Sequence, residues 1–561
     1  MKSLLRTHVA LGVLSLMCCN ILLSQNQGSD SKLDSVEAQK WSADVRFLVE
    51  QLPRRHKNLF HSMTKEQFEI SVGQLFEGIP ALSRHQIIVE LARIGAMIGD
   101  GHSGIRPLRD PKLNFRCYPI KLYYFRDGIF IQSAPESLRS IVGGKVTKID
   151  ETSVDDVYKG VAALVPRDND MTLRNLAPFL LSQPEALNSL GFVRDMESTT
   201  FTIEKNGKSQ TIALRPMPYG STVGFTRNSG WVDARDEAKD ATPLWLKYPD
   251  NLFWFEYLND TKTLYIQLNA VANKPSANGT PRETVEDFFR TVFEFADSHP
   301  LHRFVLDLRM NGGGSSELNK PILHGLIRSA KINQKGKLFV IIGRRTFSAA
   351  QNLVNELEQH TEAMFVGEPT GGRPNHYGDA MRITLPNSGI AFHVSTLWHQ
   401  EAGARDTRSW TTPYLAAELT SEEYRRNIDP AMTLILSYTY EPSKEMPELL
   451  LNPVMAHQYS NAERALREYL DDPVRAYVNV ENQVNSLGYK LLNSGRTDEA
   501  IELFKVNAKM YPHSSNVYDS LGEAYLKAEK KEMAIQNYMK SLELDPTNAN
   551  AVNALNRLKL K

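Results

Sequence analysis

The stretch FVLDLRMNGGG, residues 304–314, decides the fold, because a mainly apolar run leads through Arg-Met-Asn to three consecutive glycines. The run 304–308 is typical of a fully buried strand. Glycines after such a strand let backbone N–H groups approach a ligand and form an anion-binding nest. A phosphate loop would need a Gly-Lys-Ser/Thr ending, which the segment lacks. Glycine-rich strand exits are common, so this turn alone is only a candidate binding element.

A second apolar run, residues 338–342, leads through GRRTF to Ser348, which stands at the start of a helix expected over 349–360. A hydroxyl at that point has backbone donors beside it and the positive end of the helix behind it, which helps to bind an oxyanion. The alternative is a serine that only caps the helix, as most serines at helix starts do. Ser348 is therefore a candidate nucleophile with a purely structural alternative.

Strands and helices alternate around these two segments. We expect strands over 263–268, 303–308, 338–342 and 363–366, and helices over 282–296 and 349–360. Such an alternation predicts an α/β core.

Three motifs in this order resemble the tail-specific, or C-terminal-processing, serine peptidases of the S41 family. They are LDLRMNGG (306–313), Ser348-Ala349 and VGEPTGG (366–372), and the resemblance covers roughly residues 41–440. It implies a core with the crotonase and ClpP type of fold and makes Ser348 the nucleophile. It also implies that the oxyanion donors are the backbone N–H groups of Ala349 and of Gly312 or Gly313.

The chain departs from this family at the general base. The processing peptidases have a lysine 25 residues after the serine, where this chain has Arg373. Arginine stays protonated at physiological pH and cannot take the serine proton. Either the chain is inactive or another base serves. The tricorn-like branch of the family uses a histidine near the start of the domain followed by a hydroxyl residue, and DGHS (100–103) matches that element.

The resemblance thus implies that His102 is the base, because a neutral imidazole can accept the serine proton and return it to the leaving amine. Ser103 would then bridge His102 to a carboxylate that orients the ring. Asp406 is the candidate for that carboxylate because it follows the last core strands, and Glu368 is the rival. The polar residues 373–377 are interpreted as a solvated loop, with a role in substrate entry as the alternative.

The first 24 residues predict a secretory signal peptide, because Lys2 and Arg6 precede an apolar run, Val9–Leu23, and a polar stretch follows. That run has about 15 residues, short of the roughly 20 that a membrane span needs. We therefore expect a secreted or periplasmic protein with no stable membrane span. Lipid anchoring at Cys18 is less favoured, because Leu16-Met17 stands where a lipoprotein site has small residues.

Ahead of the core, apparent capping boxes at Thr64–Gln67 and Ser83–Gln86 predict two helices, the second ending near Gly99 and delivering His102 into a loop. Short β-rich pieces follow, separated by Asp-Gly, Gly-Gly and Asn-Gly turns. The predicted organisation is a signal peptide (1–24), an N-terminal helical subdomain (30–117), a PDZ-like β-rich module (118–217), a linker (218–250), the peptidase core (251–440), a linker helix region (441–480) and tetratricopeptide repeats (481–561).

The repeat prediction rests on a fixed period. Leu487-Gly488, Ala500-Ile501, Phe504 and Pro512 recur 34 positions later as Leu521-Gly522, Ala534-Ile535, Tyr538 and Pro546. This period and these residue types are similar to the tetratricopeptide repeat, an α-helical array. The array could hold a protein partner or could serve only as a stabilising appendage.

Composition excludes several classes of function. The 561 residues contain 65 Lys and Arg and 65 Asp and Glu, so the chain lacks the basic field of a nucleic-acid binder. Three cysteines exclude a disulfide scaffold, and the sequence has neither His-Glu-x-x-His nor Cys-x-x-Cys. We therefore predict no metal ion and no other cofactor.

The sequence favours a secreted or periplasmic serine peptidase that hydrolyses peptide or protein substrates through an acyl-enzyme. Two alternatives stay open: a non-catalytic protein that binds peptides or lipophilic ligands on the same scaffold, and an esterase.

Overall fold

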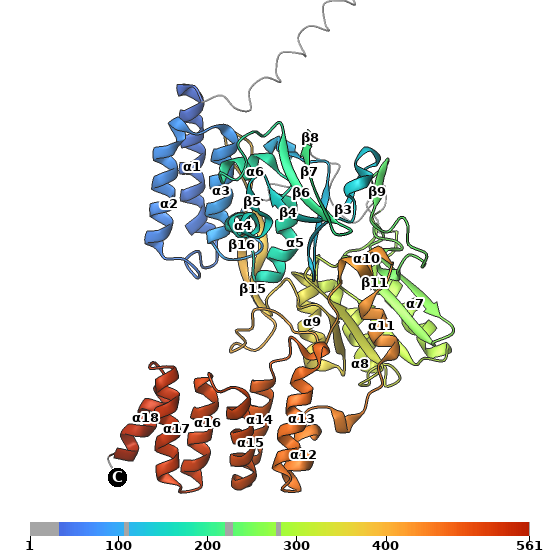
Figure 1. Ribbon diagram of the computed structural model, residues 1–561, viewed down its shortest axis with the longest axis vertical. Helices are drawn as coiled ribbons and strands as arrows, with labels where there is room; N and C mark the ends of the chain where they lie inside the picture. The colour runs from blue at the N-terminus through green and yellow to red at the C-terminus, as the bar shows by residue number, and fades with distance from the viewer. Residues whose placement is uncertain (1–32, 106–110, 219–227, 276–281, 560–561) are drawn as a thin grey trace, which may run out of the picture.

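The computed structural model describes residues 33–105, 111–218, 228–275 and 282–559. Figure 1 shows the N-terminal helices beside a β-rich region at one end of the long axis, an α/β core in the middle and a helical array at the other end. The predicted signal peptide, 1–24, lies outside the described residues. No helix within the described ranges combines the length and the apolar character needed to cross a membrane.

A six-stranded sheet forms the core, in the order β10-β11-β12-β13-β14-β17. All neighbouring strands run parallel except β10, which pairs antiparallel with β11 at one edge. The strands are β10 (Phe253–Leu258), β11 (Thr263–Leu268), β12 (Arg303–Asp307), β13 (Leu338–Ile342), β14 (Met364–Gly367) and β17 (Leu415–Ala416).

Helices cover both faces of this sheet. Successive side chains of each buried strand point to opposite faces, so each strand packs against both helical layers. On β12, Leu306 packs into the cluster formed with helices α7 (Val285–Ser298), α8 (Lys320–Arg328) and α9 (Ala349–His360). Its neighbour Val305 packs instead into the cluster formed with α11 (Pro430–Ser437). The core is thus a three-layer α/β/α sandwich, which confirms the predicted fold class.

Three helices form the N-terminal region, and two of them begin where the sequence predicts. They are α1 (Ser35–Arg55), α2 (Lys65–Gly78) and α3 (Arg84–Met97). Thr64 with Gln67 and Ser83 with Gln86 both form capping boxes, which confirms the two predicted helix starts. Helix α3 ends just before the loop that carries His102.

The β-rich region shares one hydrophobic core with α1–α3. Its sheet has the order β2-β3-β4-β6-β7, with β5 and β9 paired to β4 and β3. Three helices that the sequence pattern did not predict lie between β5 and β6: α4 (Val154–Val161), α5 (Asp170–Leu180) and α6 (Pro184–Ser189). The strands are β2 (Lys121–Phe125), β3 (Gly128–Pro135), β4 (Lys145–Ile149), β5 (Thr152–Ser153), β6 (Thr199–Lys205), β7 (Lys208–Leu214) and β9 (Trp231–Asp233), and a separate pair joins β1 (Arg116–Cys117) to β8 (Met217–Pro218).

A long hairpin joins the core to this N-terminal region. It consists of β15 (Asn375–Thr384) and β16 (Ala391–Gln400). At its turn, the buried carboxylate of Asp44 accepts hydrogen bonds from the backbone N–H groups of Asn387 and Ser388, both at 2.8 Å. Along β16, His393 forms a backbone bridge with Gly104. The hairpin therefore fixes the loop around His102 against the core.

The C-terminal array consists of antiparallel helices that share one hydrophobic core. The Leu-Gly position of each repeat is explained by close packing: a Cβ on Gly488 would lie 2.5 Å from the Phe504 ring, and one on Gly522 would lie 3.1 Å from the Tyr538 ring. The helices are α12 (Glu448–Met455), α13 (Tyr459–Asp471), α14 (Val480–Asn493), α15 (Thr497–Met510), α16 (Ser515–Lys527), α17 (Lys531–Leu544) and α18 (Ala549–Lys559), and the short α10 (Ser421–Arg425) precedes α11.

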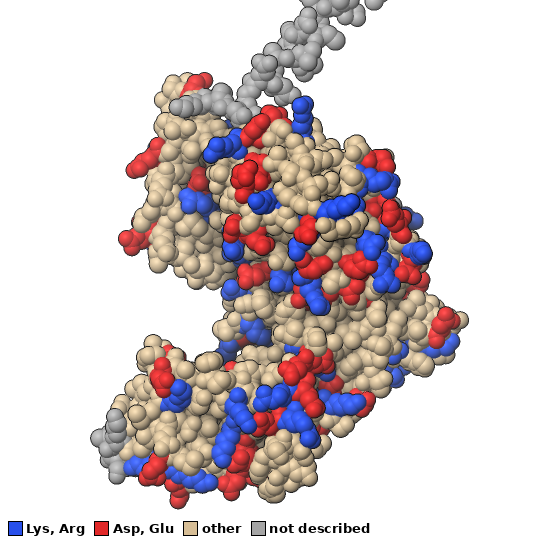
Figure 2. Space-filling view, viewed as in Figure 1, with Lys and Arg blue, Asp and Glu red and all other residues tan. Residues whose placement is uncertain are grey.

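Charged residues of both signs are interspersed over the face drawn in Figure 2. The same view shows a hollow between the helical array and the rest of the molecule. Arg475, between α13 and α14, bonds the array to the core, because it donates a 3.2 Å hydrogen bond to the carbonyl of Tyr414. It also pairs at 3.3 Å with Glu445, in the segment before the array.

Candidate active site

Ser348 stands at the N-terminus of α9, at the carboxyl-terminal edge of the core sheet. Its backbone has φ 55° and ψ −126°, a left-handed conformation that few residues other than glycine adopt. The surrounding structure imposes this strain, since Phe347 N–H donates to the Asn311 carbonyl at 3.1 Å and Thr346 Oγ1 donates to the Leu308 carbonyl at 2.9 Å. Ser348 is therefore held in a strained turn between strand and helix, unlike an ordinary capping serine.

The three-glycine turn after β12 packs directly against Ser348. A Cβ on Gly313, whose φ is 107°, would lie 2.7 Å from the Ser348 Cβ. The Gly313 N–H donates to Asn311 Oδ1 at 2.9 Å. Among the described residues, the N–H groups of Gly312 and Ala349 donate no hydrogen bond within the protein. These two N–H groups are therefore the candidate oxyanion donors, because that of Gly313 is already bonded.

The loop that carries His102 is organised by Asp100, which is buried. Asp100 Oδ1 accepts hydrogen bonds from the backbone N–H groups of His102 at 2.9 Å and Ser103 at 2.7 Å. Its Oδ2 lies 2.9 Å from His56 Nε2. Burial favours the neutral acid, but hydrogen bonds from His56, Ser103 and Ser395 outweigh it and lower the pKa of Asp100 to about 2. The loop is thus built around a carboxylate that is charged at neutral pH.

Two aromatic rings pack on the imidazole of His102. The Phe347 ring, next to Ser348 in the chain, lies 4.5 Å from it between centroids with 26° between the planes. The His376 ring lies 5.7 Å away and only 10° from parallel. His376 is the second residue of β15 and is buried, so the predicted solvated loop at 373–377 is wrong at this position. Burial lowers the pKa of His376 to about 4 and keeps it neutral.

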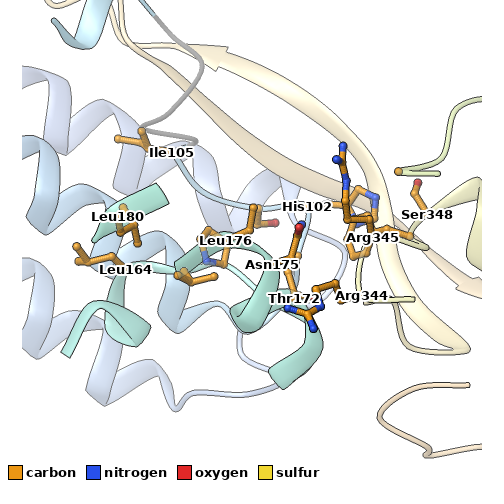
Figure 3. A pocket seen from close by; sticks show the side chains of 16 residues that line it. His102, Ile105, Leu164, Thr172, Asn175, Leu176, Leu180, Arg344, Arg345 and Ser348 are labelled. Carbon is orange, nitrogen blue, oxygen red and sulfur yellow. The ribbon is translucent and has the colours of Figure 1, made fainter. Parts of the chain in front are cut away.

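One cavity of about 350 Å³ brings the predicted groups together (Figure 3). His102, Ser103, Gly312 and Ser348 all line it. They come from the N-terminal region and from two core loops, which meet because the β15–β16 hairpin joins these regions. Within the described residues, no cluster of three or more His, Cys, Asp or Glu side chains could hold a metal ion.

The structure does not bring Asp406 to this cavity. Its carboxylate binds Arg408, with Nη2 at 2.7 Å, and hydrogen bonds from Arg408 lower its pKa against the effect of burial. The Ser103 hydroxyl does not bridge His102 to it: Ser103 Oγ donates to Ser395 Oγ at 3.1 Å and accepts from the Ser395 N–H at 3.0 Å. The local ion pair beside Asp406 decides its orientation, which motif order alone does not reveal.

Glu368, the rival carboxylate, is also committed elsewhere. It forms a buried bidentate pair with Arg344, with Nε at 2.7 Å and Nη2 at 2.5 Å from its two oxygens. Burial raises the pKa of Glu368, but the charge of Arg344 more than offsets this and holds the pKa below its usual value. Glu368 thus neutralises one of the arginines that line the cavity.

Arg373 has a structural partner in place of a catalytic one. Its Nε donates to the backbone carbonyl of Asp168 at 2.6 Å. The Asp168 carboxylate accepts from the N–H of Gly101 at 2.7 Å, so Asp168 joins the loop of Arg373 to the loop of His102. Burial raises the pKa of Asp168 to about 7. Motif reasoning gave no role to Asp100, Asp168 or Phe347, although Asp100 is the first residue of the DGHS motif and Phe347 directly precedes Ser348.

Comparison with solved structures confirms the fold. The chain is similar to mature CPAF complexed with lactacystin, with 14% identity, a TM-score of 0.51 and coverage of 72% of this chain and 99% of that one. It is also similar to mature CPAF in a second structure, with 14% identity, a TM-score of 0.50 and coverage of 72% and 98%. A weaker similarity, which adds no support for the fold, is to the photosystem II D1 C-terminal processing protease, with 13% identity, a TM-score of 0.34 and coverage of 72% and 98%.

The tetratricopeptide repeat family matches residues 515–548, which confirms the repeat predicted in the C-terminal array. This segment contains helices α16 and α17. No protein of curated function matches the sequence significantly.

Proposed function

We propose that the chain is a serine peptidase of the S41 type in which Ser348 is the nucleophile and His102 the general base. One observation carries this proposal: a single cavity is lined by a strained serine at a helix N-terminus, a histidine and a glycine turn with a backbone donor. A serine that only caps a helix needs none of these additions. The family motifs in the sequence support the same assignment.

In the proposed reaction, Ser348 Oγ attacks a peptide carbonyl while His102 takes its proton. His102 then donates that proton to the leaving amine, and water hydrolyses the resulting acyl-enzyme with His102 as base again. The N–H groups of Gly312 and Ala349 stabilise the oxyanion, assisted by the positive end of α9. Removing one such donor typically lowers the rate by roughly two to three orders of magnitude.

Asp100, Phe347 and His376 act as positioning residues for His102 in this proposal. Asp100 holds the backbone of the loop, and the two rings limit how the imidazole can tilt. Asp406 and Glu368 are not assigned the role of orienting carboxylate, because each is held by an arginine.

The proposal extends to the setting of the enzyme. The charged and apolar pattern of residues 1–24 supports export, so we place the protein outside the cytoplasm. The resemblance to tail-specific peptidases supports a PDZ-like role for the β-rich region, as a module that holds part of a substrate. The tetratricopeptide array supports binding of a protein partner.

The test is cleavage of a mixed peptide pool by the wild type, Ser348→Ala and His102→Ala, with products identified by mass spectrometry at about pH 6 to 9. Ser153→Ala is the matched control, because Ser153 caps α4 with an ordinary backbone conformation. We expect Ser348→Ala to cleave the peptides more than about a thousandfold more slowly than the wild type. Ser153→Ala should cleave them at the wild-type rate. Cleavage that survives in Ser348→Ala would refute the proposal, and turnover of matched esters but not amides would indicate an esterase.

A further inference from the structure

The cavity at Ser348 continues well beyond the groups that the reaction uses. Figure 3 shows Ser348, His102 and Arg345 at one end and Ile105, Leu164 and Leu180 at the other. We call this far part the apolar arm and define it by the cavity-lining residues Ile105, Leu164, Val165, Pro166, Leu176 and Leu180.

Helix α5 sets the length of the apolar arm. Thr172, Leu176 and Leu180 follow one another at four-residue spacing, so they lie on one face of the helix. Eight residues at a rise of about 1.5 Å correspond to about 12 Å along the cavity. That length exceeds what a short side chain such as alanine or valine can fill from the level of Ser348.

The lining of the arm determines which chemistry it accepts. All six defining residues are apolar, and Leu176 is half-buried while the other five are buried. A charged group placed there would lose its hydration, and none of the six defining side chains could pair with it, which is strongly unfavourable. An apolar group would gain the full benefit of leaving water.

We propose that the apolar arm is the specificity subsite of the enzyme and that it binds a long aliphatic or aromatic side chain adjacent to the scissile bond. The inference rests on the proposed function, since it requires Ser348 to hydrolyse peptides. Leu164, Leu176 and Leu180 are its specificity-determining residues. Because the arm is long, peptides with an unbranched side chain longer than that of leucine at this position are better substrates than peptides with leucine.

The experiment uses the full-length protein and a series of peptides that differ at one position next to the cleaved bond. That position carries alanine, leucine, phenylalanine, 2-aminooctanoic acid, aspartate or lysine, and the series is made for each side of the bond. For one of the two sides of the cleaved bond, we expect kcat/KM to rise from the alanine peptide through the leucine peptide to the 2-aminooctanoic acid peptide, by at least about 100-fold in total. Aspartate and lysine should be the poorest substrates.

Two variants connect this preference to the arm. Leu176→Gln should lower kcat/KM for the 2-aminooctanoic acid peptide at least about tenfold while changing that for the alanine peptide less than about threefold. Leu180→Phe shortens the arm, so the peptide with the highest kcat/KM should become the one that carries leucine. Leu176→Met is the matched control that keeps an apolar side chain of similar volume and should preserve the preference. Thermal unfolding of each variant establishes that it is folded.

The outcomes separate this inference from the proposed function. Cleavage that depends on Ser348 but shows no preference for long apolar side chains would overturn the inference and leave the peptidase assignment intact. A preference that Leu176→Gln and Leu180→Phe leave unchanged would also overturn it. If the wild type cleaves none of the peptides, both the inference and the proposed function fail.

Discussion

Arg373 Nε donates a 2.6 Å hydrogen bond to the backbone carbonyl of Asp168, and Arg373 stands where the sequence resemblance would imply a lysine base. The guanidinium thus links the core loop after β14 to the segment before α5. Asp168 in turn accepts a hydrogen bond from Gly101, in the loop of His102. The residue that departs from the family motif therefore helps to hold the histidine loop in place.

Arg373→Met should lower stability but not abolish activity. Arg373 is exposed, so solvent weakens its hydrogen bond, and we expect the free energy of unfolding to fall by only about 0.5 to 1 kcal/mol. The rate of hydrolysis should fall less than about tenfold, because Arg373 takes no proton. Arg382→Met, an exposed position on β15, is the control and should change neither quantity. An Arg373→Lys variant that becomes faster and independent of His102 would contradict this account.

Gly313→Ala should inactivate the enzyme, whereas Gly312→Ala should not. At Gly313, whose φ is 107°, a Cβ would lie 2.7 Å from Ser348 Cβ and 2.9 Å from the Phe347 carbonyl oxygen, so the nucleophile must move. At Gly312 a Cβ would have no atom within 4 Å, and alanine keeps the N–H donor. We expect at least about a 100-fold loss of kcat for Gly313→Ala and less than about a tenfold change for Gly312→Ala. Equal activities would show that the turn does not position Ser348.

His376 should affect kcat through the orientation of the His102 ring. Aromatic packing is worth about 0.5 to 1.5 kcal/mol, so His376→Leu should lower kcat about two- to tenfold with KM unchanged. His376→Phe restores a flat ring and should recover most of the rate. His399→Leu is the control. The His399 ring stacks on His376, with 5.1 Å between their centroids, so this variant removes a ring that packs on His376 and leaves the two rings that pack on His102. A matching loss in His399→Leu, or no rescue by phenylalanine, would count against ring positioning.

Asp168 should make the protein less stable as pH rises. Burial raises its pKa to about 7 in the folded state, against about 3.9 in an unfolded chain. Between these values the folded state holds the extra proton, so the free energy of unfolding decreases with rising pH up to about pH 7. Relative to that of Asp168→Asn, the free energy of unfolding of the wild type should fall by about 2 to 3 kcal/mol between about pH 5 and pH 8. Denaturation curves whose difference is constant with pH would refute this.

Local chain geometry could be predicted from the sequence where it is encoded in a short motif. The three-glycine turn needs positive φ at Gly313, and the Ser348 turn follows a buried strand, so both could be recognised from short motifs. Capping residues likewise located the starts of α2 and α3. These features are encoded within a few residues of one another.

Features that depend on contacts between distant segments could not be predicted. The packing of His376 on His102 requires the β15–β16 hairpin to lie against the N-terminal region, and no local pattern specifies that pairing. The apolar arm was missed because α5 lies within a region whose turns and strands dominate the sequence pattern. Asp406 was placed by motif order, yet its orientation follows from Arg408, two residues away.

The most direct measurement of the central claim is covalent labelling by a fluorophosphonate probe, which reacts with activated serines, followed by peptide mapping. The account predicts one adduct, on Ser348, with much slower labelling in His102→Ala and none on that peptide in Ser348→Ala. An unlabelled wild type, or an adduct on another serine with Ser348 unmodified, would contradict the claim that Ser348 is an activated nucleophile.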